Sequence, residues 1–438
     1  MVHQSPRSSA EYTDLLQRWG EDFTCIAPDS PGFGQSDPLP DVKPEIDDFA
    51  DALIAFLDAL GVDRCAAYGF HSGGIILVTA LKRHPQRFLR LAVGGYAIWT
   101  EDEMQNFGER YLPEWHPSPY GEHLTWLWNR MLEQSWVFPW FDTREEARLS
   151  VAHADVPKVA QAVSEMLDSG NAYQVGYGAV LRAPRDIPAI GSEVPPCLIS
   201  AYDGDPLQAH IDRLGEMPAG WRAQKVSTPA EHQDVSLAFL QEDAGEVAPL
   251  LAEDSEEGWL PLDHGLVHWK GTKGGTLVLH GPAEELAEPG AGEITIDVPG
   301  HGKSDPIVSP REGGDLPAGG SRPRGSAHAF EESISAAAAK LGAQKIRYPK
   351  LPEGDPARLY PDMTPDRFGQ YLQRAWQAAR AQAFFEPWYE ASAANAIPLD
   401  TTKLEPAALH TRARARIRAG YAARHYHEFL EHMTKDTL

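Results

Sequence analysis

Short apolar runs alternate with longer amphipathic stretches through the first half of the chain. Residues 46–60 carry apolar side chains at helical spacing, and Gly61 stands where such a helix would end. Apolar runs of strand length lie at residues 23–27, 89–93 and 197–200. This alternation, with short connections, predicts a mostly parallel, doubly wound sheet with helices on both faces. The pattern therefore indicates the α/β class.

The most informative segment reads as a strand, a tight turn and a helix, centred on His71. Gly69 and Gly73 flank the turn, and the residues two before and two after the apex of so sharp a turn must be small. Centring the turn on Ser72 would instead put Phe70 at a position where a large side chain should clash. We therefore expect His71 to point into a pocket, with Ser72 turned away or beside it.

A Gly/Pro/Asp-rich loop at residues 28–37 completes the pattern. Together with the turn around His71, it resembles the α/β-hydrolase family, in which such a loop follows the fourth strand. The resemblance implies an α/β-hydrolase fold, with the catalytic nucleophile at the apex of the turn. Histidine at the apex is atypical, because the usual ester-type acyl-enzyme cannot form on it.

The resemblance also implies the other parts of a catalytic site. Asp205 matches the family's catalytic acid, with Asp203 as the alternative, and His232 matches its catalytic histidine. The backbone N–H groups of Ser72 and Gln4 would form the oxyanion hole. We expect Asp205 and His232 to form an acid–base pair.

Residues 101–184 change to a helical and aromatic character. In the α/β-hydrolase family an insertion at this place is a cap over the active site, and the resemblance implies one here. Most of its aromatic side chains should form the core of the cap, while a minority should face the pocket and favour an apolar or aromatic substrate. The candidates for the pocket are Trp126, Trp128, Trp136 and Trp140.

The pattern starts again after residue 255. Residues 297–306 repeat residues 29–38 at an offset of 268, and eight identities link residues 113–140 to residues 361–388 at an offset of 248. We therefore predict a reduced tandem copy that includes a second cap.

The second copy lacks the catalytic parts of the first. Its turn positions are taken by Lys350, Leu351 and Pro352. No counterpart of Asp205 or His232 follows. We expect residues 1–255 to form a hydrolase core that lacks its opening strands, and residues 256–438 to form a degenerate second domain. Either the natural start lies upstream of Met1, or the strands of the second copy complete the first sheet.

Charge and cysteine content narrow the choice of partners. The formal net charge of −24 argues against a nucleic acid or an anionic membrane as the main partner, and no run of 18 apolar residues is present. The three cysteines lie far apart in strand-like runs, which is typical of core positions in the reducing cytoplasm. We expect a small-molecule substrate, no metal and no cofactor. A pairing of the two domains within one chain and a homodimer both stay open.

Three interpretations of the function remain. The first is a hydrolase acting on an ester, amide, lactone or C–C bond, with His71 or a displaced Ser72 attacking. The second is a cofactor-free lyase or isomerase in which His71 and His232 move protons. The third is a non-catalytic protein that keeps the fold as a binding module. The family resemblance makes the hydrolase our working hypothesis.

Overall fold

The computed structural model describes residues 1–150, 152–243, 245–246, 256–307 and 327–435. The chain divides into two compact units. Unit 1 comprises Met1–His116 and Leu127–Leu251, and unit 2 comprises Pro117–Trp126 and Ala252–Leu438. The sequence suggested a single division near residue 255. The structure adds the short segment Pro117–Trp126 to unit 2, and each unit is described by itself below.

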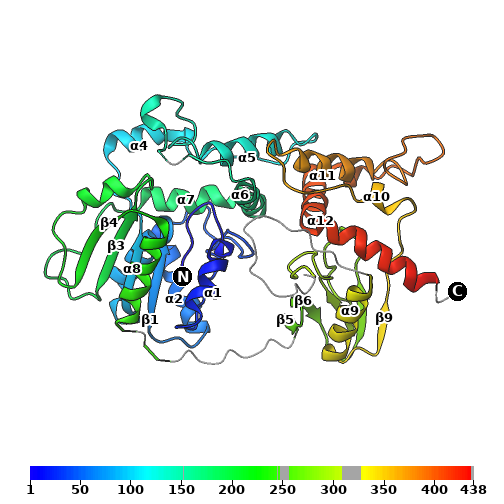
Figure 1. The fold of residues 1–438 in the computed structure, drawn as a ribbon, viewed down its shortest axis with the longest axis horizontal. Helices are drawn as coiled ribbons and strands as arrows, with labels where there is room; N and C mark the ends of the chain where they lie inside the picture. Colours follow the sequence, from blue (N-terminus) through cyan, green and yellow to red (C-terminus); the bar gives the residue numbers. More distant parts are fainter. Residues whose placement is uncertain (151, 244, 247–255, 308–326, 436–438) are drawn as a thin grey trace. The chain divides into compact units, whose positions relative to one another are not determined.

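Unit 1 is built on a four-stranded parallel sheet (Figure 1). Its strands, in chain order and in spatial order, are β1 (Cys65–Phe70), β2 (Phe88–Gly94), β3 (Cys197–Tyr202) and β4 (Trp221–Val226). Leu91 of β2 pairs with Ala67 on one side and with Cys197 on the other. The predicted α/β class is confirmed.

Helices cover both faces of this sheet. They are α1 (Thr13–Trp19), α2 (Ile46–Ala59), α3 (Ser72–Arg83) and α8 (Pro229–Gln241). Leu91 and Val93 of β2 pack in one core with α2 and α3. Ala92, which lies between them, packs in another core with Trp19 of α1 and Phe239 of α8. Such alternation follows from the two-residue period of a strand, and it gives the doubly covered sheet that the sequence predicted.

A helical segment is inserted between β2 and β3, and we call residues 101–184 the helical insertion. Its helices are α4 (Glu101–Phe107), α5 (Glu122–Glu133), α6 (Val156–Ser169) and α7 (Ala172–Arg182). The part that belongs to unit 1 has its own buried side chains, among them Trp128, Val163 and Tyr173. Its bulky residues therefore serve first to form a core.

Unit 2 contains a five-stranded mixed sheet. The strands are β5 (Glu257–Leu262), β6 (Gly265–Gly271), β7 (Thr276–Leu279), β8 (Glu293–Ile296) and β9 (Lys345–Arg347). Their spatial order is β5-β6-β8-β7-β9, with β7 parallel to both neighbours and β6 antiparallel to both of its own. The helices are α9 (Ala327–Leu341), α10 (Pro356–Leu359), α11 (Gln370–Ala381) and α12 (Pro406–Lys435). A kink at Gly420, with φ of 47°, divides α12.

One turn of unit 1 recurs in unit 2 with the same hydrogen bonds. In each case a histidine ring accepts the backbone N–H of a loop residue. Nε2 of His3 accepts the Ser30 N–H at 2.9 Å, and Nε2 of His280 accepts the Val298 N–H at 3.0 Å. In both turns Nδ1 of the same ring lies within 3.0 Å of the next residue's carbonyl oxygen. The two sequence stretches thus fold in the same local way.

The helical elements recur at the offset of 248 residues. Helix α11 spans the residues that lie 248 positions after those of α5. An isolated β-bridge joins Val137 to Arg148, and its counterpart joins Phe385 to Ala396. The indole N–H groups at residues 140 and 388 each donate, at 3.1 Å, to the carbonyl oxygen 29 residues earlier. These matches extend the sequence repeat to backbone geometry.

The strand that we expected at residues 23–27 does not form, so that prediction was wrong. The matching segment of unit 2 is β8, which pairs with β6 and β7. In the described part of unit 1, this edge has only an isolated bridge between Val2 and Gly69 and one hydrogen bond, of 2.7 Å, from the Met1 amino group to the Ile26 carbonyl oxygen. A strand needs a ladder of partners, and here the ladder is missing.

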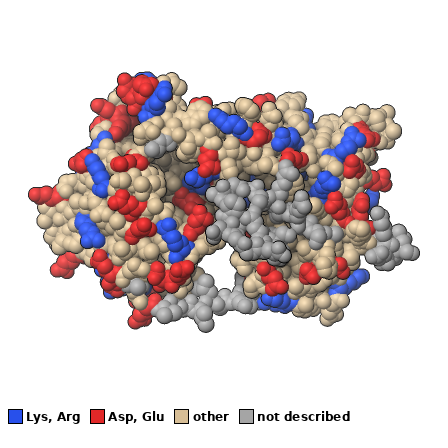
Figure 2. All heavy atoms as spheres, in the orientation of Figure 1, with Lys and Arg blue, Asp and Glu red and all other residues tan. Residues whose placement is uncertain are grey.

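Acidic side chains are spread over both units. Figure 2 shows Asp and Glu across the visible face, with Lys and Arg between them. This agrees with the net charge of −24. Among the described helices, none combines the length and the apolar character needed to cross a membrane.

Candidate active site

The sharp turn between β1 and α3 holds His71 in a strained conformation. Its φ of 49° and ψ of −114° lie where L-residues are seldom found. A Cβ atom added to Gly69 would lie 2.7 Å from the Gly73 carbonyl carbon, and one added to Gly73 would lie 1.9 Å from the Val2 carbonyl oxygen. Both positions therefore require glycine, and the turn has its apex at His71.

Asp205 orients the His71 ring. Nε2 of His71 lies 3.0 Å from Oδ1 of Asp205, whose side chain is fully buried. The Leu207 N–H donates to the same oxygen at 2.8 Å. Burial alone would raise the pKa of Asp205, but the charge and hydrogen bond of His71 and the Leu207 N–H outweigh it and hold the pKa below its ordinary value. Asp203, the alternative acid, lies outside this pair and accepts a hydrogen bond from Gln208.

This pairing fixes the tautomer of His71. An ionised Asp205 only accepts, so the proton between the two residues is on Nε2 and the lone pair of the ring is on Nδ1. Within the described residues, Nδ1 takes part in no hydrogen bond, and about a quarter of the His71 side chain is exposed. Gly95, with φ of 56°, makes room for the pair, because a Cβ there would lie 2.3 Å from the His71 ring. An imidazole that is held in this way, with one ring nitrogen bound to a carboxylate, can act as a general base.

The structure does not bring His232 and Asp205 into a pair, contrary to our expectation. His232 lies near the start of α8, where Nδ1 is 2.8 Å from Ser200 Oγ and Nε2 is 3.0 Å from the Tyr68 hydroxyl. Burial and the nearby charge of His71 together lower the pKa of His232 to about 4, although Asp205 acts in the opposite direction. The reason for the difference is that both ring nitrogens already have hydroxyl partners, while His71 occupies Asp205.

Phe70 packs against both imidazole rings. Its ring stacks on His71 at 4.1 Å between centroids and meets His232 edge-on at 5.5 Å. The turn thus places an aromatic ring in contact with two histidines that have different partners.

One of the two expected oxyanion donors, the Gln4 N–H, already has a partner. The Ser72 side chain is buried, and its Oγ accepts the backbone N–H of Ser5. The Gln4 N–H donates to Oε1 of Glu11 at 2.7 Å, and the Gln4 side chain donates to Oε2 at 2.9 Å. A carboxylate therefore occupies the place where a substrate oxygen would be bound.

A cavity of about 320 Å³ is lined by Phe70 and His232, but neither His71, which we expected to point into a pocket, nor Asp205 is among its lining residues. Its polar lining includes Glu11, Arg18 and Tyr202. None of the four indoles proposed from the sequence lines this cavity, and Trp126 belongs to unit 2. Trp128 is 2% exposed, and the indole N–H groups of Trp136 and Trp140 donate to backbone carbonyl oxygens of the helical insertion. These three side chains serve the core of the insertion.

Sequence reasoning missed Glu11, Tyr68 and Ser200. Tyr68 and Ser200 could have been found, because they lie near the carboxyl ends of β1 and β3, the two parallel strands that flank β2, and side chains converge at that edge of the sheet. Glu11 gives no such signal. Its contact with Gln4 depends on how the N-terminal segment packs, which no local pattern reveals.

Residues 1–163 match the model described as alpha/beta hydrolase fold. This match and the parallel sheet of unit 1 show an alpha/beta hydrolase fold in this part of the chain. The sharp turn at His71, which we call the elbow, and the preceding Gly/Pro/Asp loop both lie within the matched residues.

Several known proteins are similar to this chain. Haloalkane dehalogenase 2 of Mycobacterium tuberculosis (strain ATCC 25618 / H37Rv) is 30% identical over 104 residues, which are 24% of this chain and 36% of that protein. The cis-3-alkyl-4-alkyloxetan-2-one decarboxylase of Shewanella oneidensis is 32% identical over 126 residues, which are 27% of this chain and 35% of that protein. The chain thus spans about a third of the length of these two relatives. Among solved structures, a thermophilic esterase of Thermogutta terrifontis covers 55% of this chain and 88% of its own, with 15% identity and a TM-score of 0.41.

Proposed function

We propose that unit 1 is a hydrolase in which His71 acts as a general base and Asp205 holds its ring. Nδ1 of His71 takes a proton from water as the water oxygen bonds to the electrophilic carbon of a small, apolar or aromatic ester or lactone. The protonated imidazole then returns the proton to the leaving oxygen as its bond to carbon breaks. Asp205 stays ionised and stabilises the imidazolium.

One observation carries this proposal: Nε2 of His71 is bound by a fully buried carboxylate while Nδ1 is left to act. His232 is a poorer candidate for the base, because hydroxyl groups engage both of its nitrogens and burial disfavours its charged form. Ser72 is a poorer nucleophile, because its Oγ is buried against the Ser5 N–H.

The repeat supports a division of labour between the units. We infer that the helical insertion is a cap and that the helices of unit 2 are its duplicate, since α5 and α11 match in length and at both flanking contacts. The turn positions Lys350, Leu351 and Pro352 offer no pair like that of His71 and Asp205. Unit 1 would then perform the chemistry.

The decisive test is an esterase and lactonase screen of the full chain with p-nitrophenyl butyrate and small lactones. We expect turnover that is lost in His71→Ala and kept in Ser72→Ala, with no labelling by a fluorophosphonate probe. Labelling of Ser72, or full activity in His71→Ala, would overturn the proposal.

A second candidate is a lyase or isomerase in which His71 moves a proton and no acyl intermediate forms. Two observations favour it: Glu11 occupies the Gln4 N–H, and one relative is a decarboxylase. Exchange of a substrate C–H for deuterium in D₂O, without hydrolysis and dependent on His71, would favour this candidate over hydrolysis.

A further inference from the structure

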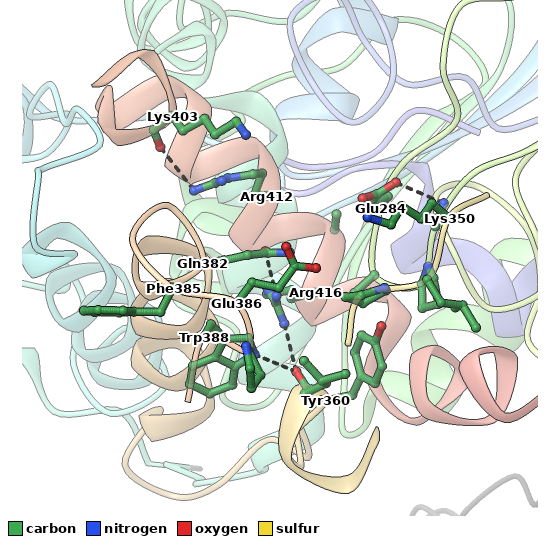
Figure 3. Close-up of a pocket in the computed structure, with 18 of the residues that line it drawn as sticks. Glu284, Lys350, Tyr360, Gln382, Phe385, Glu386, Trp388, Lys403, Arg412 and Arg416 are labelled. Carbon is green, nitrogen blue, oxygen red and sulfur yellow. Dashed lines mark hydrogen bonds between the residues drawn. The ribbon is translucent and has the colours of Figure 1, made fainter. Parts of the chain in front are cut away.

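A large cavity lies in unit 2, away from any residue of the proposed catalytic pair. Its volume is about 590 Å³, within the usual range for small-molecule sites. It is bounded by the turn after β7, by residues 350–352, by residues 382–388 and by α12 (Figure 3). All of these segments belong to unit 2.

Arg416 of α12 lines this cavity as a buried cation without a carboxylate partner. The residue is 6% exposed. Its guanidinium donates to the Leu359 carbonyl oxygen at 3.3 Å and to Oε1 of Gln382 at 2.8 Å, and both acceptors are uncharged. Within the described residues, no carboxylate lies within ion-pair distance of it. Burial lowers the pKa of Arg416 to about 10, which shows the cost of keeping the charge there.

Arg412 presents a second guanidinium one helical turn earlier. It donates to the carbonyl oxygens of Ala379 and Lys403, and its Nε has no partner. Burial lowers the pKa of Arg412, and its positive charge in turn lowers the pKa of Arg416. Like charges at this spacing on a helix repel each other. The chain has 63 acidic and 39 basic residues, so carboxylates are plentiful. Among the described residues, however, none forms an ion pair with Arg412 or Arg416.

Three acidic residues line the cavity, and each of them either has another partner or is exposed to solvent. Glu284 accepts the Gly281 N–H at 3.0 Å, and Glu285 lies 3.4 Å from Arg418. Glu386 is exposed, so water screens its charge. Glu284 acts on Arg416 only at longer range, and none of these carboxylates forms an ion pair with either guanidinium in the described structure.

In unit 1 the corresponding glutamine also contacts a buried arginine, and side chains of the protein stabilise the charge of that arginine. There, Gln134, the counterpart of Gln382, holds Arg130 of α5 at 3.3 Å. The rings of Trp140 and Tyr173 lie 5.3 and 5.7 Å from the Arg130 guanidinium carbon, so they stabilise the buried charge. In unit 2 the residue that matches Arg130 is Ala378, and the guanidinium comes instead from α12. In the described structure no aromatic ring stacks on the Arg416 guanidinium, and Arg416 lines the cavity.

Part of the wall is apolar and aromatic. It includes Leu351, Pro352, Tyr360, Phe385, Trp388 and Ile397. The Trp388 indole N–H is taken by the Leu359 carbonyl oxygen, so its ring offers the cavity an apolar surface. A ligand that suits the whole cavity therefore has one anionic end and an apolar body.

We propose that this cavity binds a small organic carboxylate, whose carboxylate is held by Arg412 and Arg416 and whose apolar or aromatic body lies against the wall. The carboxylate would supply the counter-charge that both guanidinium groups lack, and its two oxygens suit the forked N–H groups of arginine. This site is independent of the chemistry proposed for unit 1.

The test is calorimetric titration of the full chain with benzoate, alongside benzamide and inorganic phosphate. We expect saturable binding of benzoate, none of benzamide and weaker binding of phosphate. Arg412→Gln should weaken benzoate binding at least about tenfold, whereas Arg424→Gln, which removes an exposed partner of Glu428 on the same helix, should leave it unchanged. Arg416→Lys tests the buried position while keeping the charge, and we expect it to weaken binding because lysine lacks the forked geometry.

Four outcomes would overturn the proposal. They are no saturable binding of benzoate, equal binding of benzamide, tighter binding of phosphate than of benzoate, and unchanged binding in Arg412→Gln. His71→Ala separates this site from unit 1: unchanged benzoate binding supports the proposal, and lost binding places the site in unit 1 and ends it. Should Arg416→Lys lose its fold by circular dichroism, Arg412→Gln still decides, because Arg412 is only half-buried.

Discussion

Nε2 of His71 lies 3.0 Å from Oδ1 of Asp205, so the residue at the apex of the elbow is itself the partner of the acid. The sequence resemblance implied a chain of three groups, with His232 between the apex and Asp205. In the structure the His71 imidazole itself contacts Asp205, and His232 contacts two hydroxyl groups instead. The site thus holds an imidazole that a buried carboxylate orients.

Asp205→Asn should lower kcat by about 100-fold or more while leaving the fold intact. An asparagine amide can donate to Nε2, which would move the ring proton to Nδ1 and remove the lone pair that accepts the substrate's or water's proton. The measurement is kcat on any substrate that the parent turns over, with circular dichroism as the check on folding. Asp203→Asn is the matched control, because Asp203 contacts Gln208 and lies outside the pair. Equal losses in both variants would contradict the assigned role.

The buried His232 should make the protein less stable as the pH falls from about 6.5 to 4. Its pKa is lowered to about 4 in the folded state, below the usual value near 6.5. The unfolded state therefore binds more protons in this window, and the free energy of unfolding rises with pH across it, by up to about 1.4 kcal/mol per pH unit for this one group.

The measurement is the melting temperature of parent and His232→Gln from pH 7.5 to 4.5. We expect the parent to lose more on acidification than the variant. His116→Gln, at a largely exposed position, should follow the parent. A parent and a His232→Gln variant with parallel pH profiles would refute this account.

The sequence predicted correctly those features of the fold that depend on residues close together in the chain. The spacing of Gly69 and Gly73 predicted the apex at His71, because a Cβ at Gly69 collides with the backbone of Gly73 inside the same turn. The collision at Gly73 is with Val2, and it depends on how the N-terminal segment packs. The alternation of helix and strand patterns with short connections predicted a sheet covered on both faces, and the structure confirms it.

Predictions that depend on distant partners did less well. Residues 23–27 have the composition of a strand, yet they form none, since the partners that β8 has in unit 2 lack counterparts at this edge of unit 1. The choice of Asp205 between two histidines, and the contact of Glu11 with Gln4, are likewise set by packing between segments far apart in sequence.

Gly73→Ala should destabilise unit 1 by about 3 kcal/mol or more. Its Cβ would lie 1.9 Å from the Val2 carbonyl oxygen, so the turn or the N-terminal segment must shift, and a shift of that segment would disturb the hydrogen bond from the Val2 N–H to the Tyr68 carbonyl oxygen. Gly178→Ala is the control, because its Cβ would meet only the flexible end of Arg182 at 3.1 Å within α7. Calorimetric unfolding should separate the two variants, and similar stability of both would show that the elbow is not as tight as described.

Glu11→Gln should stabilise the protein relative to the parent as the pH rises from about 4.5 to 7. Burial raises the pKa of Glu11 to about 7, even though Arg7 and the two N–H groups of Gln4 favour the carboxylate. The folded parent therefore binds more protons than the unfolded chain in this window, so its free energy of unfolding falls as the pH rises. A glutamine keeps an oxygen for the Gln4 N–H and carries no charge, which removes this dependence.

The measurement is the difference in melting temperature between Glu11→Gln and the parent from pH 4.5 to 8. We expect the difference to grow in favour of the variant up to about pH 7 and then to level off, since Glu11 is ionised in both states above that pH. Glu109→Gln, at an exposed position in the helical insertion, should show no such trend. Because the pH trend for Glu11 has the opposite sign to that for His232, the two variants distinguish a buried acid from a buried base in the same site. A constant difference across the range would mean that the Glu11 carboxyl is not held in the buried state that its contacts with Gln4 indicate.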